Sequence, residues 1–182
     1  MSDKNILYLE SDIMNHNKIK ELTLIGLGMA AVFAGTMVMI PNATGGYFNL
    51  GDGFIMLFAS IVNPLGAFMI GGVASAMVDA VSGYAHYVIP TMIIKGLEGV
   101  SISYLMNKYY KSNPRIKYIA YLIGAVIMVT GYFLAKWYMK QSLAIALVTA
   151  PENVFQSAVG YVIAILLHPT ISSLAEKFRK GK

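Results

Sequence analysis

Residues 54–82, FIMLFASIVNPLGAFMIGGVASAMVDAVS, decide the fold, because this apolar run is compatible with either one helix or two. A helix needs about 20 apolar residues to cross a bilayer, so the run is long enough for one crossing. The sequence Asn63-Pro64-Leu65-Gly66 interrupts it. Proline is disfavoured inside a helix but suits its first turn. The run therefore predicts either one kinked helix or a short helix, a turn and a second helix.

The composition indicates a membrane protein. Of the 182 residues, 57% are hydrophobic and 13% are charged. Soluble domains are about 45–50% apolar with glycine included and about 25% charged. Only lipid accepts this much apolar surface, and runs of this length cross it as helices. We therefore predict an all-α integral membrane protein. The absence of cysteine excludes disulfides, thiolate metal sites and cysteine nucleophiles.

The positive charges decide between one helix and two. Lys18 and Lys20, the loop at residues 108–117 and the tail at residues 177–182 carry clusters of lysine and arginine. Such clusters mark the cytoplasmic side, so an even number of crossings must separate the first cluster from the second. Residues 21–40 and the run after Pro90 supply two crossings, so residues 54–82 must supply two more.

We therefore predict six transmembrane helices in a multi-pass protein of the plasma membrane, with both termini cytoplasmic. The expected helices cover residues 21–40, 53–63, 64–82, 91–109, 117–139 and 149–175. Pro151 is expected in the first turn of the sixth helix, and a kink or break is expected at His168-Pro169. Residues 1–13 are interpreted as a loosely ordered leader or tag, and residues 14–182 as a single six-helix domain.

The second helix is short. Residues 53–63 would extend only about 16 Å at 1.5 Å per residue, which is too little to cross a bilayer. The preceding stretch, residues 42–53, is rich in glycine and asparagine. Non-helical backbone is tolerated at membrane depth where protein or water covers it. We expect this loop to dip inward and to form a lid or a wall of a pocket on the outer side.

Ionisable and amide side chains at membrane depth are unfavourable and usually face an interior or a water-filled cavity. They are Asp79, Lys95, Glu98, Lys136, Asn153 and Gln156. Lys95 and Glu98 are three residues apart on one helix face, close enough to form an ion pair. Alternatively, Glu98 accepts a hydrogen bond from an amine, amidine or hydroxyl of a ligand. Gly96 and Gly99 leave room for a ligand or a second helix.

Two further groups could contact a flat ligand. Tyr132, Lys136 and Trp137 end the fifth helix, where the rings form either an interfacial belt or a stacking wall. Asn153 and Gln156 share a face of the sixth helix, where they read a heteroaromatic edge or bond to neighbouring helices. His86 and the loop at residues 49–52, from Asn49 to Asp52, are expected to be gating or rim groups of the pocket.

The chain lacks the motifs of an enzyme or an ATPase. No HExxH, no metal-ligand spacing and no GxSxG occurs, so we predict neither catalysis nor a metal site. No GxxxxGK[ST] loop occurs either, so ATP-driven transport would need other subunits. We predict no cofactor on this chain.

Small residues line the centre of the first helix. Ala30, Ala31, Ala34 and Gly35 are spaced so that another helix can approach closely. That helix belongs either to this chain or to a partner subunit. The spacing alone favours neither alternative.

The stretch YFNLGDGFIMLFASIVNPLGAFMIGGVASAMVDAVSGYAHYVIPTMIIKGLEG, residues 47–99, resembles the substrate-binding S components of energy-coupling factor (ECF) transporters. These subunits capture vitamins for a class of ABC importers. The shared features are the LGD loop, the Asn63-Pro64 run, the SGY…PT…IKG run, the GYFLA element at 131–135 and the helix with Asn153 and Gln156. The resemblance covers most of residues 20–175.

The resemblance implies six helices, a pocket near the outer face, and no enzymatic activity. It implies that Ala30 and Ala34 dock to a transmembrane coupling subunit, that two ATPases supply energy, and that the S component topples in the membrane to release its load. The expected ligand residues are Glu98 as polar anchor, Asn153 and Gln156 as edge readers, and Tyr132 and Trp137 as stacking surfaces.

Within the family, the sequence is most similar to the branch that serves hydroxymethylpyrimidine or pyridoxine. Lys136 follows GYFLA where that branch often has an acidic residue, so an anionic or carbonyl-bearing ligand is an alternative. Pantothenate and riboflavin are therefore alternative vitamins. A facilitator for small solutes that acts alone is a further alternative.

Overall fold

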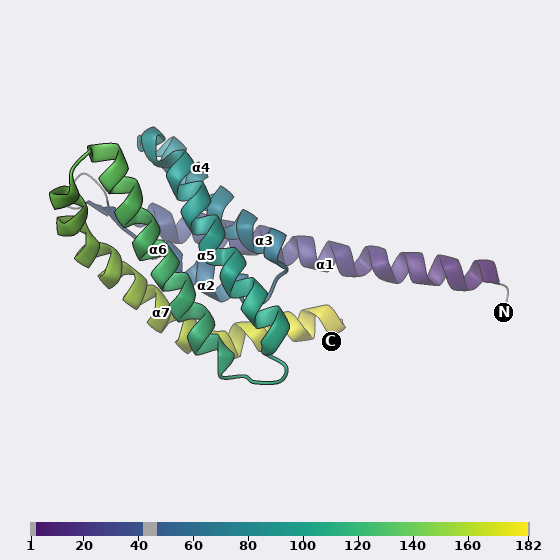
Figure 1. Ribbon diagram of the computed structural model, residues 1–182. Helices are drawn as coiled ribbons and strands as arrows, with labels where there is room; N and C mark the ends of the chain where they lie inside the picture. Colours follow the sequence, from purple (N-terminus) through teal and green to yellow (C-terminus); the bar gives the residue numbers. More distant parts are fainter. Residues whose placement is uncertain (1–2, 42–46, 182) are drawn as a thin grey trace.

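The computed structural model describes residues 3–41 and 47–181, with backbone only for residues 3–15 (Figure 1). Residues 42–46 of the predicted lid lie outside the described residues. The elements are α1 (Asp3–Met37), β1 (Ile40–Pro41), β2 (Tyr47–Phe48), α2 (Gly51–Ala59), α3 (Pro64–Phe68), the π-helical η1 (Met69–Val73), α4 (Ala74–Val81), the 3₁₀ turn η2 (Ala85–Tyr87), α5 (Val88–Tyr109), α6 (Ile116–Lys140) and α7 (Leu143–Lys180).

The protein is an all-α membrane protein. In its described part, five helical segments are long and apolar enough to cross a bilayer: His16–Met37, Pro64–Val81, Ala85–Tyr109, Ile116–Lys140 and Leu143–Lys180. The helix α2 has only 9 residues, about 13 Å, against a hydrocarbon core of about 30 Å. The number of crossings and the assignment of residues 1–13 as a leader stay predictions.

The run at residues 54–82 divides into two helical segments. The helix α2 ends at Ala59, and α3 begins at Pro64. Between them, Asn63 has an extended backbone, and its side-chain oxygen accepts a hydrogen bond from the Gly66 amide at 2.8 Å. This N-cap and the proline at the first helical position are a favourable start for a helix. Of the two alternatives for this run, the helix–turn–helix is therefore the one adopted.

Glycines allow the segment from α3 to α4 to pack against the backbone of α5. A Cβ atom on Gly71 would collide with the carbonyl oxygen of Lys95, and one on Gly99 would collide with the carbonyl oxygen of Ala67. Small residues commonly permit such close helix pairs in membranes. Gly99 therefore makes room for a helix, which was one of the two uses expected for it.

The helix α7 differs from its prediction. It begins at Leu143, where the Ser142 hydroxyl accepts a hydrogen bond from the Ile145 amide at 3.3 Å. Pro151 therefore lies inside the helix, and its expected position in the first turn is wrong. The helix also continues without a break past Pro169 to Lys180. Figure 1 shows that its last, yellow part runs in a different direction from its green part, consistent with a kink rather than a break.

One end of the bundle is held by charged contacts. Arg179 donates to Glu21 Oε2 at 2.9 Å, and Lys20 donates to the Arg179 carbonyl at 2.9 Å. Glu21 Oε1 accepts from the Asn63 amide at 2.9 Å. The first and last positive clusters and the α2–α3 turn therefore lie at the same end, as the charge distribution requires.

The same half of the bundle contains a buried polar network around His168. Its Nδ1 atom lies 2.7 Å from the Tyr121 hydroxyl, and its Nε2 atom lies 3.0 Å from the Tyr110 hydroxyl. Ser60 Oγ lies 3.3 Å from the same Nδ1. The network joins α6, α7 and the ends of α2 and α5, and it supplies partners for a side chain that is 1% exposed.

The close approach of η1 to α5 can be tested by Gly71→Ala. The added methyl group meets backbone that cannot rotate away, so we expect overpacking of about 1–3 kcal/mol and a fall in Tm of about 5 °C or more in detergent. Gly26→Ala is the matched control, because Gly26 has no atom within 4 Å of its Cβ position. Equal melting temperatures for the two variants would contradict the packing described.

Candidate functional site

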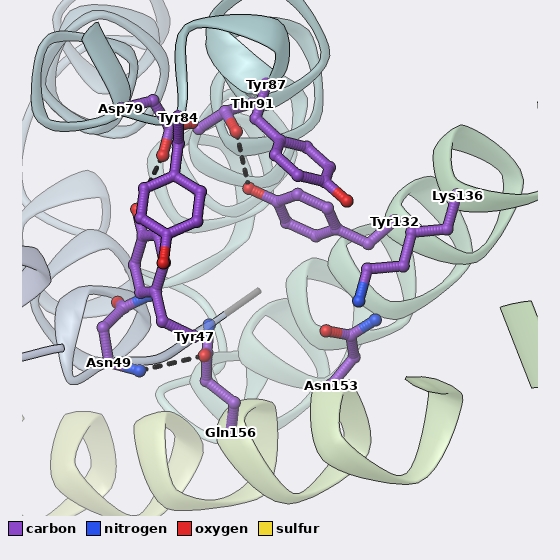
Figure 2. A pocket seen from close by; sticks show the side chains of 10 residues that line it. All are labelled: Tyr47, Asn49, Asp79, Tyr84, Tyr87, Thr91, Tyr132, Lys136, Asn153 and Gln156. Carbon is purple, nitrogen blue, oxygen red and sulfur yellow. Dashed lines mark hydrogen bonds between the residues drawn. The ribbon is translucent and has the colours of Figure 1, made fainter. Parts of the chain in front are cut away.

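Polar and aromatic side chains surround a cavity of about 50 Å³ at the opposite end of the bundle from the Glu21–Arg179 contact. At this end α4 and α6 finish and α5 and α7 begin (Figure 1). Figure 2 shows the lining residues, which are Tyr47, Asn49, Asp79, Tyr84, Tyr87, Thr91, Tyr132, Lys136, Asn153 and Gln156. Segments far apart in the sequence thus converge on one small space.

The cavity is smaller than an organic ligand. A water molecule takes about 30 Å³ of liquid, and ligand pockets usually measure about 300–1,000 Å³. A volume of about 50 Å³ therefore has room for one or two waters. Binding of a heterocycle requires lining side chains to move outward.

One wall of the cavity is built around Asp79. The Tyr47 hydroxyl donates to Asp79 Oδ1 at 2.6 Å, and the Tyr47 and Tyr84 ring centres are 4.8 Å apart. Burial, aided by the bond to Asp79, raises the pKa of the Tyr47 hydroxyl above its usual range, so this group stays a donor at neutral pH. Beside it, the Thr91 and Tyr132 hydroxyls are 3.0 Å apart.

A buried charged layer adjoins the cavity. Lys95 forms an ion pair with Asp52 Oδ1, and Gln156 Nε2 donates to Asp52 Oδ2 at 2.5 Å. Gln156 Oε1 accepts a hydrogen bond from the backbone N–H of Asn49 at 3.0 Å. Both ends of the Gln156 amide are thus used within the protein. Its contacts connect α7 to α2 and to the chain after β2.

Glu98 lies in this layer and does not line the cavity. Its side chain is 0% exposed, and Oε2 is 3.6 Å from Lys95 Nζ. The predicted pairing of Lys95 with Glu98 is therefore present, but Asp52 is the closer partner. Neither carboxylate oxygen of Glu98 has a hydrogen-bond partner among the residues described. Lys95 also lies outside the cavity wall, with Nζ 5.5 Å from the centre of the Tyr132 ring.

Five of the residues predicted to bind a ligand do line the cavity: Asn49, Tyr132, Lys136, Asn153 and Gln156. Asn153 is notable because its Nδ2 atom is buried and has no hydrogen-bond partner in the described part of the chain. Lys136 is only 5% exposed. These two side chains bring polar atoms to the side of the cavity formed by α6 and α7, as Figure 2 shows.

Two other predicted residues lie away from the cavity wall. Trp137 is 47% exposed. It follows Lys136 on α6, and successive helical residues point about 100° apart. With Lys136 turned inward, Trp137 faces outward. His86 is exposed, with its ring centre 4.6 Å from that of Tyr87, so only the neighbouring tyrosine reaches the cavity.

Four lining residues had no predicted role, namely Tyr47, Tyr84, Tyr87 and Thr91, and Asp79 was singled out for its depth but not as a ligand contact. Asp79 is the lone carboxylate in the apolar run at residues 54–82, and this isolation was the signal available. The tyrosines flank the predicted lid and the predicted outer loop. Their spacing matches neither a helix face nor a strand face, so no periodicity marked them.

The small residues of α1 divide between two faces. Gly28 and Gly35 pack inward, since a Cβ atom on either would meet Ile70 or Phe54. Ala30 and Ala34 are exposed. Among the described residues, no helix of this chain covers these two alanines.

One larger hollow, of about 290 Å³, shares Tyr47, Asn153 and Gln156 with the cavity, whereas the others are apolar. A groove of about 430 Å³ between α6 and α7 is lined almost wholly by apolar side chains, including Leu122, Val126 and Val162. Such a surface suits lipid chains rather than a water-soluble ligand. The small polar cavity is therefore the candidate binding site.

Comparisons with known proteins agree with the architecture. A family model described as "ECF-type riboflavin transporter, S component" matches residues 16–173. The chain is 29% identical over 174 residues to the thiamine precursor transporter HmpT of Lactococcus lactis subsp. cremoris (strain MG1363), covering 93% of this chain and 99% of that protein. It is 39% identical over 97 residues to an uncharacterised protein of Pyrococcus woesei, covering 53% of this chain and 64% of the other.

The matched region contains all the residues that line the cavity and the exposed alanines of α1. It extends over most of the chain, from the first apolar run into the last helix. The chain therefore belongs to the family of ECF-type transporter S components.

Proposed function

We propose that this S component captures a small vitamin-like heterocycle of the hydroxymethylpyrimidine or pyridoxine type from outside the cell. The observation that carries the proposal is the polar cavity, which is lined by tyrosines and amides at one end of an apolar helical bundle. Polar groups without a hydrogen-bond partner are unfavourable at membrane depth, and those that are present there usually belong to a functional site. A bound solute would supply their missing partners.

The lining suits a small aromatic ring with polar edges. Tyrosine rings offer flat apolar faces together with hydroxyl groups. The Asn153 amide can both donate and accept, as the edge of a pyrimidine or pyridine requires. HmpT, whose name describes a thiamine precursor transporter, aligns with this chain over 99% of its length. That likeness supports a ligand of the same class.

We assign the ligand contacts to Asn153, Tyr132 and Lys136. Gln156 and Asn49 hold the wall of the cavity, because their mutual hydrogen bond connects α7 to the chain before α2. In this proposal Glu98 and Lys95 act beneath the wall rather than at the ligand. His86 and Trp137 lie at the rim. The cavity would widen on binding. The loss of conformational entropy would be small, because the surrounding helices are already in place.

Delivery of the ligand requires further subunits. The chain has no ATP-binding loop, so we propose that two ATPases and a transmembrane coupling subunit complete the importer. Ala30 and Ala34 would be the docking surface for the coupling subunit, because they form a close-approach face that this chain leaves exposed.

Riboflavin is the second candidate ligand, because the matching family model carries that description. Its three-ring system is much larger than the cavity and would need a greater rearrangement of the wall. A purified protein that retained riboflavin would be yellow, whereas one that retained a pyrimidine or pyridine would not.

The ligand class is tested by mass spectrometry of small molecules released from the purified, denatured protein. We expect a hydroxymethylpyrimidine-like or pyridoxine-like compound in near-stoichiometric amount, because an enclosed polar cavity retains its ligand through purification. Release of riboflavin would favour the second candidate. A protein that retains no small molecule and binds none of these vitamins when they are added would contradict the proposal.

The contact with Asn153 is tested by Asn153→Ala. Loss of a buried hydrogen bond should weaken ligand binding by about 1–2 kcal/mol, or roughly 5- to 30-fold in Kd, without loss of folded protein. Isothermal titration in detergent measures the change. Asn113→Ala is the matched control, because Asn113 is an exposed loop residue that caps Arg115 and lies outside the cavity. Equal affinities in both variants would contradict the assignment.

The docking surface is tested by Ala34→Leu. A larger side chain should prevent close helix contact, so we expect loss of co-purification with the coupling subunit and loss of uptake, with ligand affinity unchanged. Ala158→Leu introduces the same change on the exposed face of α7 and should leave assembly intact. Normal assembly of the Ala34→Leu protein would place the docking surface elsewhere.

A further inference from the structure

The candidate cavity has charged groups on two different sides. Asp79 comes from α4, and Lys136 comes from α6 (Figure 2). The cavity therefore presents a hydrogen-bond acceptor on one side and a donor on the other. A ligand that matched both sides would need a donor group at one end and an acceptor group at the other.

Asp79 is a buried carboxylate with an unused oxygen. The side chain is 2% exposed, and its Oδ1 accepts the hydrogen bond from Tyr47. Its Oδ2 is buried and has no hydrogen-bond partner in the described residues. The Thr91 hydroxyl interacts with the Asp79 carboxylate and lies 3.0 Å from the Tyr132 hydroxyl, but it makes no hydrogen bond of ordinary geometry with Oδ2. A carboxylate oxygen left without a donor in such a place is strongly unfavourable.

No cation in the described part of the protein pairs with Asp79. Of the two buried lysines, Lys95 is paired with Asp52 and Glu98, and Lys136 lies on another side of the cavity. His86 is the basic residue near Asp79, but its ring stacks on tyrosines and is exposed. Asp79 therefore differs from Asp52, the other buried aspartate near the cavity, whose two oxygens both have partners within the protein.

We propose that Asp79 is the residue that selects the ligand, by accepting a hydrogen bond at Oδ2 from the N–H of an amino substituent on the ligand ring. The inference rests on the proposed function and narrows its ligand class. Tyr47 acts as a positioning residue, because its bond to Oδ1 fixes the Asp79 carboxylate at the wall of the cavity. Lys136 and Asn153 then face the hydroxyl or ring-nitrogen end of the same ligand.

The proposal distinguishes between the vitamins considered. An aminopyrimidine alcohol has an N–H donor and a hydroxyl oxygen on the same small ring, so it can match Asp79 and Lys136 together. A carboxylate placed beside Asp79 would be repelled, so an anionic ligand could use only the Lys136 side. Hydrogen-bonding sites reject analogues that lack the bonded group far more strongly than apolar sites do.

Two soluble probes test the inference on the full-length protein. They are 4-amino-5-hydroxymethyl-2-methylpyrimidine and the same compound with hydrogen in place of the amino group. We expect the wild type to bind the amino compound at least about tenfold more tightly, as measured by isothermal titration in detergent. In Asp79→Asn, which replaces one oxygen by an NH₂ donor, this preference should fall below about threefold.

Tyr47→Phe is the matched variant. It retains the carboxylate and removes only the hydrogen bond to Oδ1. We expect both probes to bind more weakly to it, while the preference for the amino compound persists. A residue with a purely structural role would instead weaken both probes equally in Asp79→Asn, and that result would overturn the inference while leaving the proposed function intact.

The wild type alone also provides a test. If it binds both probes with equal affinity, Asp79 does not read the amino group and the inference is wrong, whether or not the variants fold. If it binds neither probe and no pyridoxine-type compound, the proposed ligand class fails and the inference fails with it; if it binds only a pyridoxine-type compound, the inference alone fails. The two failures are therefore distinguishable.

Discussion

Charged groups inside a lipid-embedded protein must be paired, and the Asp52–Lys95 ion pair is the contact on which the rest of this structure depends. The helix α2 is too short to cross a membrane by itself, yet its first turn is held deep in the bundle by this pair. Gln156 bonds to the second oxygen of Asp52, so α7 is fixed to the same point. A side chain on Gly160 would collide with Asp52, which indicates how closely α7 approaches α2. Breaking the pair would leave a buried charge on α2 or on α5.

The polar groups of the interior form two sets, one with hydrogen-bond or ion-pair partners inside the protein and one without. Asp52, Lys95 and Gln156 have their partners within the chain. At the cavity, Oδ2 of Asp79 and Nδ2 of Asn153 have none in the described residues. The first set stabilises a fixed arrangement of helices, and the second has hydrogen-bonding capacity left for a solute. Glu98 and the hydroxyls of Thr36, Ser75 and Ser157 are exceptions, because they lack hydrogen-bond partners in the described residues and do not line the cavity.

Much of the fold follows from local rules that a sequence displays. The apolar runs, the positive clusters and the Asn63-Pro64 signal predicted the helical segments and the division of residues 54–82. The start of α7 was missed, because Pro151 was taken as a sign of a helix beginning when it lies in the interior. The Asp52–Lys95 pair joins residues 43 positions apart, and no periodicity connects an N-terminal helix turn to a distant lysine. Glu98 was expected at the ligand because the sequence did not reveal Asp52 as the closer partner of Lys95. Asn153 and Lys136 were singled out by their depth and polarity, and both line the cavity, although an outward direction was the first expectation for Lys136. Their contact with a ligand stays a prediction.

The contacts among Glu21, Asn63 and Arg179 have a mechanical consequence. They join the membrane-entry end of α1, the α2–α3 turn and the last turns of α7 into one closed ring of hydrogen bonds. A force applied to α1 by another protein would consequently be shared by distant segments instead of detaching a single helix.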